Sequence, residues 1–518
     1  MINIVGSGVA GLSTAIHLAK DGKSSNLISV QEAWRAQSVM AEGGINAALD
    51  TMNENDSPDE HYADTLKGGA YLADKTAVRD LTNKAPDIVM WLKEIGVPFE
   101  VKGGKIIQRN FGGQRKKRTA YVKSSTGKML MTALCDEARK YETAGLIRRF
   151  SHHEVYDVVI EDGRCRGIKL LDKYTGKTLR LNGQTVLACG GLTGFFPSMT
   201  TGSTDNTGKL VSDLFIKGVK LANLEMIQYH PTTIEISGKR MLISEAARGE
   251  GARFMTYENG EPYYFMEKLF PEEGNLVTRD IAARTIDRIL QDERYDHKVY
   301  LDLRGIDKSI LNGKLSDLKE EIRDHFDIDI SKEPIRIYPG IHYFMGGVCV
   351  DNAHQSSIPG LYAAGECACI YHGANRLGGN SLLGAIYGGM VIAGHIPEDT
   401  DNEIMEINED ISGYEIRDSL SARIRDILKD GMGIIRNEQG MLRTIDDLDG
   451  LFDENLTYSE KNKIITAKAM LKSALSRKES RGAHYRSDYP EPDDNYLKTT
   501  VASYDTDINI EFTEFSGE

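Results

Sequence analysis

The chain has 518 residues and a formal net charge of −14 at pH 7, with 40% hydrophobic and 27% charged residues. This length predicts more than one domain, and the acidic balance argues against a nucleic-acid-binding groove. Because no run of about 18 apolar residues exists, we expect no membrane-spanning helix. The six cysteines lack the spacing of a zinc site or iron–sulfur cluster, so we predict reduced thiols and no bound metal.

The first residues of the chain predict a dinucleotide-binding turn. Residues 2–5 are apolar, Gly6, Gly8 and Gly11 form a G-x-G-x-x-G motif, and residues 12–20 have the pattern of a helix. In such a motif the first glycine allows a tight turn and the second lets the backbone approach a pyrophosphate. The third glycine lets the helix pack closely on the preceding strand.

A second strand at residues 26–30 would complete a βαβ unit. Glu32 has the spacing of the acid that binds a ribose hydroxyl, but it falls beyond the expected end of this strand. Because the first strand starts at residue 2, we expect no secretory or transit peptide and a cytoplasmic location.

Regular elements continue in alternation through the first half of the chain. Helices are expected at residues 58–70, 74–95 and 126–143, and strands at 154–160, 164–171 and 185–191. The glycine pair at 43–44 would allow a backbone to approach a flat ring, although a packed turn explains it equally well. The basic run at 115–118 is interpreted as a solvated loop, or otherwise as a contact for an acidic partner or phosphate.

Between residues 226 and 376, ionisable groups occur within otherwise apolar segments, each beside Gly, Pro or Thr. They are His230, Thr232, Glu245, Arg248, Arg279, His342 and Arg376. A single buried histidine or arginine is usually structural, but independent structural roles for all of these are improbable. Two arginines and two histidines around one ligand suit a dicarboxylate, because arginine binds a carboxylate in bidentate fashion.

The stretch at residues 360–383 combines an apolar strand, Glu366, a glycine-rich bend with Arg376, and a helix that Asn380 or Ser381 would cap. Free N–H groups at such a helix start suit anions or electron-rich carbonyls. Beyond it, amphipathic segments at 403–410, 415–437 and 458–477 predict a three-helix unit, followed by a tail that wraps the surface.

Eleven motifs, in order from residue 1 to about residue 491, give the chain a specific resemblance. They are GSGVAG, AEGGINAAL, GGKIIQRNFGGQ, VLACGG, MIQYHPTT, ISEAARGEGA, TRDIAAR, HYFMGGV, GLYAAGE, HGANRLGGNSLL and ESRGAHYRSDYPE. The chain resembles the flavoprotein subunit of the fumarate reductase/succinate dehydrogenase family, which includes L-aspartate oxidase.

The resemblance implies an α/β protein: a Rossmann-like FAD-binding domain with an inserted α+β capping domain and a C-terminal helical domain. We assign residues 1–228 and 336–398 to the FAD-binding domain, 229–335 to the capping domain, and 399–518 to the C-terminal domain and tail. The family also implies a small dicarboxylate substrate and an iron–sulfur or other electron-transfer partner. Through such partners the protein could be peripheral to the inner face of a membrane.

Residue roles follow by resemblance alone. Arg279 would exchange the proton, with Glu245 and Arg248 as its relay, while hydride passes between flavin and substrate. His342 and Arg376 would hold one carboxylate, and His230 and Thr232 the other. The positions that match flavin contacts are Gly6, Ser7, Gly8, Val9, Ala10, Gly11, Ser29, Ser38, Met40, Gly43, Gly44, Tyr343, Glu366, Ser381 and Leu382.

The chain departs from the family at four positions. Gln37 stands where respiratory members carry the histidine that binds FAD covalently, so FAD should be non-covalent. Lys209 replaces the acid of a T-G-D-G motif that touches the cofactor, Glu42 replaces a glutamine, and Gly384 replaces an acid.

We weigh three functions and expect the first. The first is fumarate reduction, its reverse, or reduction of another unsaturated acid. The second is L-aspartate oxidation, which EAARGEGA and RDIAAR favour. Phe111 opposes it, because it stands where the oxidase has a glutamate for the substrate ammonium, and a desolvated ammonium needs that partner. The third is an FAD-binding redox or interaction protein without turnover.

Overall fold

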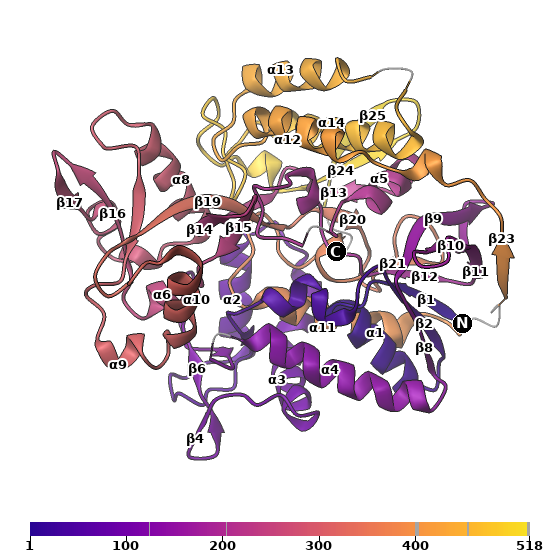
Figure 1. The fold of residues 1–518 in the computed structure, drawn as a ribbon, viewed down its shortest axis with the longest axis horizontal. Coiled ribbons are helices and arrows are strands. Elements are labelled where there is room, and N and C mark those ends of the chain that lie inside the picture. The colour runs from indigo at the N-terminus through magenta and orange to yellow at the C-terminus, as the bar shows by residue number, and fades with distance from the viewer. Residues whose placement is uncertain (124, 204, 399–402, 453–454, 515–518) are drawn as a thin grey trace.

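The computed structural model describes residues 1–123, 125–203, 205–398, 403–452 and 455–514. Figure 1 shows a nucleotide-binding region around a parallel sheet, a separate lobe formed by β14 to β19 and α6 to α10, and a layer of C-terminal helices above them. No helix among these residues is long and apolar enough to cross a membrane. The predicted boundary at residue 399 lies outside the described residues.

The nucleotide-binding region is organised around a sheet in the order β21-β12-β1-β2-β8, in which all paired strands are parallel. Its strands are Ile2–Val5 (β1), Ser25–Ser29 (β2), Ile147–Ser151 (β8), Thr185–Leu187 (β12) and Leu361–Ala363 (β21). Helix α1 (Val9–Lys20) packs against α4 (Thr126–Thr143) and α11 (Asn380–His395). The predicted βαβ unit is therefore confirmed, with β12 as the strand that returns beside β1.

A second, antiparallel sheet consists of His153–Glu161 (β9), Arg164–Asp172 (β10), Thr178–Asn182 (β11) and Ile404–Ile407 (β23). Asp162 and Gly163 both have positive φ, 51° and 68°, as a tight hairpin turn requires. The prediction of a helix at 403–410 is wrong, because β23 extends the free edge of β11. The segment has isoleucine at both ends, which suits a strand.

The inserted lobe, or cap, contains the sheet β15-β14-β19-β18-β16-β17. Its strands are Ile227–Ile236 (β14), Lys239–Leu242 (β15), Arg253–Glu258 (β16), Glu261–Tyr263 (β17), Val299–Asp302 (β18) and Ile335–Phe344 (β19). Its helices are Ala246–Gly249 (α6), Phe265–Leu269 (α7), Arg279–Gln291 (α8), Lys308–Leu311 (α9) and Ser316–Phe326 (α10). The cap has a hydrophobic core of its own, and β14 and β19 run across both predicted domain limits.

The C-terminal layer contains α12 (Asp418–Gly431), α13 (Glu438–Asp449) and α14 (Tyr458–Ser476). Helix α13 therefore takes the place of the helix expected at 403–410. The tail does not simply wrap the surface, because Thr499–Tyr504 (β24) and Ile508–Thr513 (β25) form a hairpin. This hairpin joins the sheet of β13 (Leu221–Ala222), β20 (Gly347–Cys349) and β22 (Ala368–Cys369).

The remaining elements lie around these layers. They are α2 (Pro58–Gly68), α3 (Lys75–Glu94), α5 (Lys209–Ile216), and the short strands β3 (Ile45–Asn46), β4 (Val101–Lys102), β5 (Lys105–Ile106), β6 (Gln108–Arg109) and β7 (Thr119–Ala120). The basic run at 115–118 is not a uniformly solvated loop. Arg118 is fully buried and forms ion pairs with Asp56 and Asp64, and Arg115 also pairs with Asp64. These acids neutralise much of the run.

A buried ion network attaches the C-terminal segment to the nucleotide-binding region. The Arg477 guanidinium lies 2.7 Å from Glu225 and 2.8 Å from Glu479, and all three side chains are fully buried. Arg477 also donates to the carbonyl oxygens of Tyr496 and Lys498, at 2.6 Å each. The path of the chain before β24 therefore depends on this arginine.

We expect Arg477→Leu to lower the free energy of unfolding by about 3–5 kcal/mol, because it leaves the buried Glu225 carboxylate without its cation, while Glu479 keeps its ion pair with Arg481. Urea unfolding followed by circular dichroism measures this. Arg139→Leu is the control, since Arg139 forms an exposed pair with Asp136 on α4, worth about 0–1 kcal/mol. Equal effects of the two substitutions would contradict the assignment.

Candidate functional site

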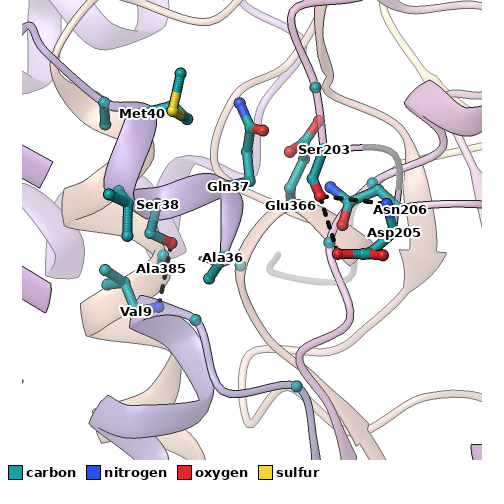
Figure 2. A pocket seen from close by; sticks show the side chains of 18 of the residues that line it. Val9, Ala36, Gln37, Ser38, Met40, Ser203, Asp205, Asn206, Glu366 and Ala385 are labelled. Atoms are coloured by element: carbon teal, nitrogen blue, oxygen red, sulfur yellow. Dashed lines mark hydrogen bonds between the residues drawn. The ribbon is translucent and has the colours of Figure 1, made fainter. Parts of the chain in front are cut away.

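A cavity of about 820 Å³ runs from the first βα turn to the cap. It is lined by residues of β1, β2, the segment 34–44, β19, the start of α11 and the cap. Figure 2 shows part of its wall, where Ser38, Met40 and Gln37 lie on one side and Ser203, Asn206 and Glu366 on the other. A cavity of this size, which includes the glycine-rich first βα turn, suits a dinucleotide.

Glycines at the cavity allow close packing that a side chain would prevent. Gly6 has φ +114°, and a Cβ there would overlap the Ala188 carbonyl oxygen. A Cβ on Gly11 would overlap the Gly6 carbonyl oxygen, so Gly11 serves helix–strand packing and lies behind the cavity wall. A Cβ on Gly43 would lie 2.9 Å from the Phe111 ring. These contacts agree with the roles predicted for the fingerprint glycines.

All other residues predicted to contact the cofactor line this cavity. They are Gly6, Ser7, Gly8, Val9, Ala10, Ser29, Ser38, Met40, Gly43, Gly44, Tyr343, Glu366, Ser381 and Leu382. Ser38 Oγ accepts a hydrogen bond from the Val9 N–H at 3.2 Å, which joins the segment 34–44 to the start of α1 (Figure 2). Burial raises the pKa of Glu366 to about 7.

Two of the unusual positions have defined surroundings. Lys209 lines the cavity, and its ammonium lies 3.2 Å from Glu154, so a lysine–glutamate pair stands where the family has an acid. Gln37 also lines the cavity and donates to the Thr201 carbonyl oxygen at 3.3 Å. Glu32 lies beyond β2, as expected, and its carboxylate is 3.1 Å from His152.

The prediction that Asn380 or Ser381 caps the helix is wrong. The N-cap of α11 is Gly379, with φ +85°, and Asn380 is the first helical residue. A Cβ at Gly379 would overlap the Asn46 side chain, so glycine is required there. The Asn380 side chain instead bonds to residues of other elements.

In the cap, one buried carboxylate binds two arginines. Glu245 Oε2 accepts from Arg279 Nε at 2.9 Å and from Arg279 Nη2 at 2.8 Å, while Glu245 Oε1 lies 3.1 Å from Arg248 Nη2. Burial raises the pKa of the Glu245 carboxyl, but Arg279 and Arg248 outweigh burial and hold it below its usual value. The glutamate therefore stays ionised and links the two guanidinium groups.

Gln228 connects the cluster of Glu245, Arg279 and Arg248 to Arg376, which is predicted to bind a substrate carboxylate. Gln228 Oε1 accepts from Arg279 Nη1 and from Arg376 Nη2, at 3.1 Å each. The Arg376 guanidinium also lies over the Tyr343 ring, 4.5 Å from its centroid. Burial, and then the neighbouring Arg279, lower the pKa of Arg376 to about 9. Arg376 Nε is buried and has no hydrogen-bond partner among the described residues.

The two predicted histidines lie together, with ring centroids 5.1 Å apart. Both line the cavity, and burial, together with Arg279, lowers the pKa of each well below its usual value. His230 Nε2 is buried and has no hydrogen-bond partner in the part of the chain that the structure describes, and His342 Nδ1 bonds to Thr201 Oγ1 at 2.8 Å. The register of β14 on β19 brings them together, since His230 pairs with Gly340 and a bulge follows at Pro231.

Thr232 does not line the cavity, contrary to what a substrate contact requires. Its hydroxyl donates to the Ile243 carbonyl oxygen at 2.8 Å and lies 3.2 Å from His230 Nδ1, so it positions that histidine. Arg248 also lies behind the wall, in contact with Glu245, as a relay position would.

Sequence reasoning missed Gln228, Ser244 and the Gly112 amide. Gln228 was noticed only as part of a motif, and Ser244 lines the cavity next to Glu245. The Gly112 N–H donates to Glu245 Oε1 at 3.0 Å. Gln228 lies two residues before His230, and Ser244 directly precedes Glu245. This closeness to a predicted ionisable residue was the signal that could have found both. The Gly112 contact spans 133 residues, and no local pattern indicates it.

The buried Phe111 lines the cavity, and near it lies Glu42. The Glu42 carboxylate has no ion-pair partner among the residues described here. Burial, and then Glu321 of the cap, raise the pKa of Glu42 to about 8, although a hydrogen bond with Ser244 acts in the opposite direction. At neutral pH this side chain is therefore mainly a neutral hydrogen-bond donor.

A cavity that suits a dinucleotide thus ends against buried arginines and histidines. The FAD binding domain family model matches residues 2–382, and the fumarate reductase flavoprotein C-terminal model matches residues 455–516. The chain therefore belongs to the succinate dehydrogenase/fumarate reductase flavoprotein family, and its cofactor is FAD. The alternative of a protein without turnover finds no support in this family.

Individual relatives agree with this assignment. The succinate dehydrogenase flavoprotein subunit of Bacillus subtilis is 36% identical, over 97% of this chain and 94% of that protein. The 8-methylmenaquinol:fumarate reductase flavoprotein subunit of Wolinella succinogenes is 33% identical, over 97% and 88%. A solved E. coli quinol fumarate reductase FrdA superposes with a TM-score of 0.86 at 28% identity, covering 100% of this chain and 97% of that one.

We expect acid precipitation of the purified protein to release all of its FAD, because Gln37 offers no imidazole for a covalent bond. Flavin absorbance of the supernatant and pellet measures this, and free FAD added to a flavin-free protein is the control. A yellow pellet, or a fluorescent protein band on a denaturing gel, would contradict the prediction.

Proposed function

We propose that the chain is the catalytic flavoprotein subunit of an enzyme that interconverts fumarate and succinate. The observation that carries this proposal is the pair of buried, unpartnered nitrogens at the cavity, His230 Nε2 and Arg376 Nε, with Arg279 nearby. An unpaired buried polar group costs free energy unless a ligand binds it. Two such groups, each with a cationic neighbour, support a ligand that has an anionic group at each end.

In this proposal His342 and Arg376 hold one carboxylate, and His230 holds the other with Ser244 beside it. The arginine side chains are already ordered by Gln228, Glu245 and Tyr343, so little conformational entropy is lost when the substrate binds. Burial strengthens these charge interactions, because water is largely excluded from the pocket. The same cations stabilise charge that develops on the substrate as its double bond is attacked.

FAD, when bound, supplies or accepts the hydride. Arg279 donates or takes the proton at the other carbon of the double bond. An arginine is a weak acid, but a carbanion beside a carboxylate is a far stronger base, so the transfer is downhill. Glu245 bonds to Arg279 and to Arg248, and it can restore the proton along this chain.

A second candidate is oxidation of an amino dicarboxylate such as L-aspartate. Phe111 opposes it, because its ring packs against Gly43 and Gly378 and supplies no carboxylate of its own for an ammonium group. Glu42 favours it only above about pH 8, where its carboxyl at the cavity is ionised and can bind an ammonium group. The relatives named above act on succinate or fumarate by name, which supports the first candidate.

The same family supports an electron-transfer partner. No group of three or more His, Cys, Asp or Glu side chains within the described part of the chain could hold a metal ion. We infer from the family that electrons arrive from, or leave to, a separate carrier, such as an iron–sulfur subunit or a quinone-linked protein. Such a partner could place the chain at the inner face of a membrane.

A direct test compares substrates with the isolated protein and artificial electron carriers. We expect fumarate-dependent oxidation of reduced viologen and succinate-dependent reduction of a dye, with no iminoaspartate from L-aspartate. Iminoaspartate production without activity on either C4 acid would reject the first candidate in favour of the second. Activity on another unsaturated acid alone would reject both.

We expect Arg279→Gln to lower kcat by at least about 10³-fold, because a missing proton donor costs about 10²–10⁴-fold and a positive charge is lost as well. FAD content by absorbance should be unchanged. Arg288→Gln is the matched control, since Arg288 is exposed on the same helix and bonds to Tyr485. Activity of the Arg279 variant near the wild-type value would refute the proton role.

Glu42 predicts a pH dependence of substrate binding. Below pH 8 its carboxyl is neutral, and above pH 8 its charge repels a dicarboxylate. We therefore expect KM for fumarate to rise by about tenfold between pH 7 and pH 9, which corresponds to about 1.4 kcal/mol. Glu42→Gln should abolish this rise. An equal rise in the variant would assign the titration to another group.

A further inference from the structure

The start of helix α11 is fixed by a buried polar cluster that lies outside the substrate cavity. The cluster consists of Asn46, His61, Thr65, Gln114 and Thr119, and we call it the α11 anchor. All five side chains are buried, and they come from β3, α2, β7 and the turn before β7. Four separate segments thus converge on one helix end.

Asn46 holds the backbone just before the helix. Its main-chain N–H donates to the Gly379 carbonyl oxygen at 3.1 Å, and its Nδ2 donates to the Gly378 carbonyl oxygen at 2.7 Å. Its Oδ1 accepts from Gln114 at 2.9 Å and from Thr119 at 2.6 Å. Gln114 also donates to the Gly378 carbonyl oxygen, at 2.9 Å. The peptide groups at 378 and 379 therefore cannot rotate without breaking several buried hydrogen bonds.

His61 and Thr65 hold the first residue of the helix. Asn380 Oδ1 accepts from Asn46 Nδ2 at 2.7 Å and lies 3.0 Å from His61 Nε2, while Asn380 Nδ2 donates to Thr65 Oγ1 at 2.9 Å. Since an amide oxygen can only accept, His61 must carry its proton on Nε2. His61 Nδ1 has no partner, and burial, then Arg118, lower the His61 pKa to about 4. The imidazole is thus a neutral donor at physiological pH.

We propose that the α11 anchor is a set of positioning residues that fixes the redox potential of the flavin. The inference rests on the proposed function in one respect, namely that the flavin lies against the first turn of α11. That turn lines the cavity through Gly379, Ser381 and Leu382. Its free N–H groups and the helix dipole favour negative charge, which the flavin gains on reduction.

The stabilisation depends on orientation, so a loosened helix start should bind reduced FAD less well while oxidised FAD is affected less. The potential then becomes more negative. The hydrogen bonds of His61 and Thr65 go to Asn380 and none goes to the arginine–glutamate chain among the described residues, and a titration without substrate measures the potential apart from proton transfer.

The test is a dye-equilibrated redox titration of the flavin in the purified holoprotein without substrate. His61→Leu removes the donor to Asn380, and we expect the preference for reduced over oxidised FAD to fall by about tenfold, a shift of about 30 mV to more negative potential. His61→Gln keeps an N–H donor and should restore the wild-type potential. Amide hydrogen exchange at Ser381 and Leu382 should become faster in the leucine variant only.

His17→Leu is the matched control, because burial also lowers the pKa of His17 to about 4. This histidine is near the C-terminal end of α1, packs on Trp91 of α3 and does not line the cavity. The flavin redox potential of this variant should equal that of the wild-type protein. If His61→Leu does not fold, Thr65→Val serves instead, since it removes only the acceptor for Asn380 Nδ2 and should shift the potential in the same direction.

Equal potentials in the leucine and glutamine variants, whether shifted or not, would overturn the inference. So would an unchanged potential in Thr65→Val together with faster exchange at Ser381. Because the titration needs no substrate, a protein that fails to reduce fumarate but shows the expected shifts would refute the proposed function and leave this inference standing.

Discussion

The site depends on the way one carboxylate and one amide oxygen organise three buried arginines. Glu245 neutralises Arg279 and Arg248, and Gln228 Oε1 accepts from both Arg279 and Arg376. Guanidinium groups so close together repel one another, and burial weakens the screening that water would provide. Each arginine shares a hydrogen-bond acceptor with its neighbour, and this reduces the repulsion between the guanidinium groups. The cluster keeps a surplus of positive charge, which a dianionic substrate would offset.

The fold supplies the rigidity that this arrangement requires. Strands β14 and β19 carry both histidines and pass from the cap into the nucleotide-binding region, so the two lobes share a continuous pair of strands. Paired glycines before α11 and in the segment 43–44 remove side chains where backbones approach closely. On the far side, the α11 anchor holds the helix end that faces the cavity.

Local pattern failed where long-range pairing decided the outcome. Residues 404–407 form a strand because β11 offers a free edge, although the amphipathic pattern of 403–410 predicted a helix. Residues 499–513 form a hairpin whose first strand, β24, pairs with β13. Arg118 is buried because Asp56 and Asp64, more than 50 positions away, neutralise it. Thr232 lies behind the cavity wall, where its hydroxyl donates to the Ile243 carbonyl oxygen.

The sequence by itself determined the dinucleotide turn, the return strand, the set of ionisable residues and the family. Each of these depends on residue type and short spacing, which constrain a backbone locally. Only the tertiary structure decided which of those residues share a cavity, which nitrogens lack partners, and which groups hold the start of α11. Hydrogen bonds between residues hundreds of positions apart, such as that of Asn46 with Gly378, have no sequence pattern, because they depend on how distant elements pack together.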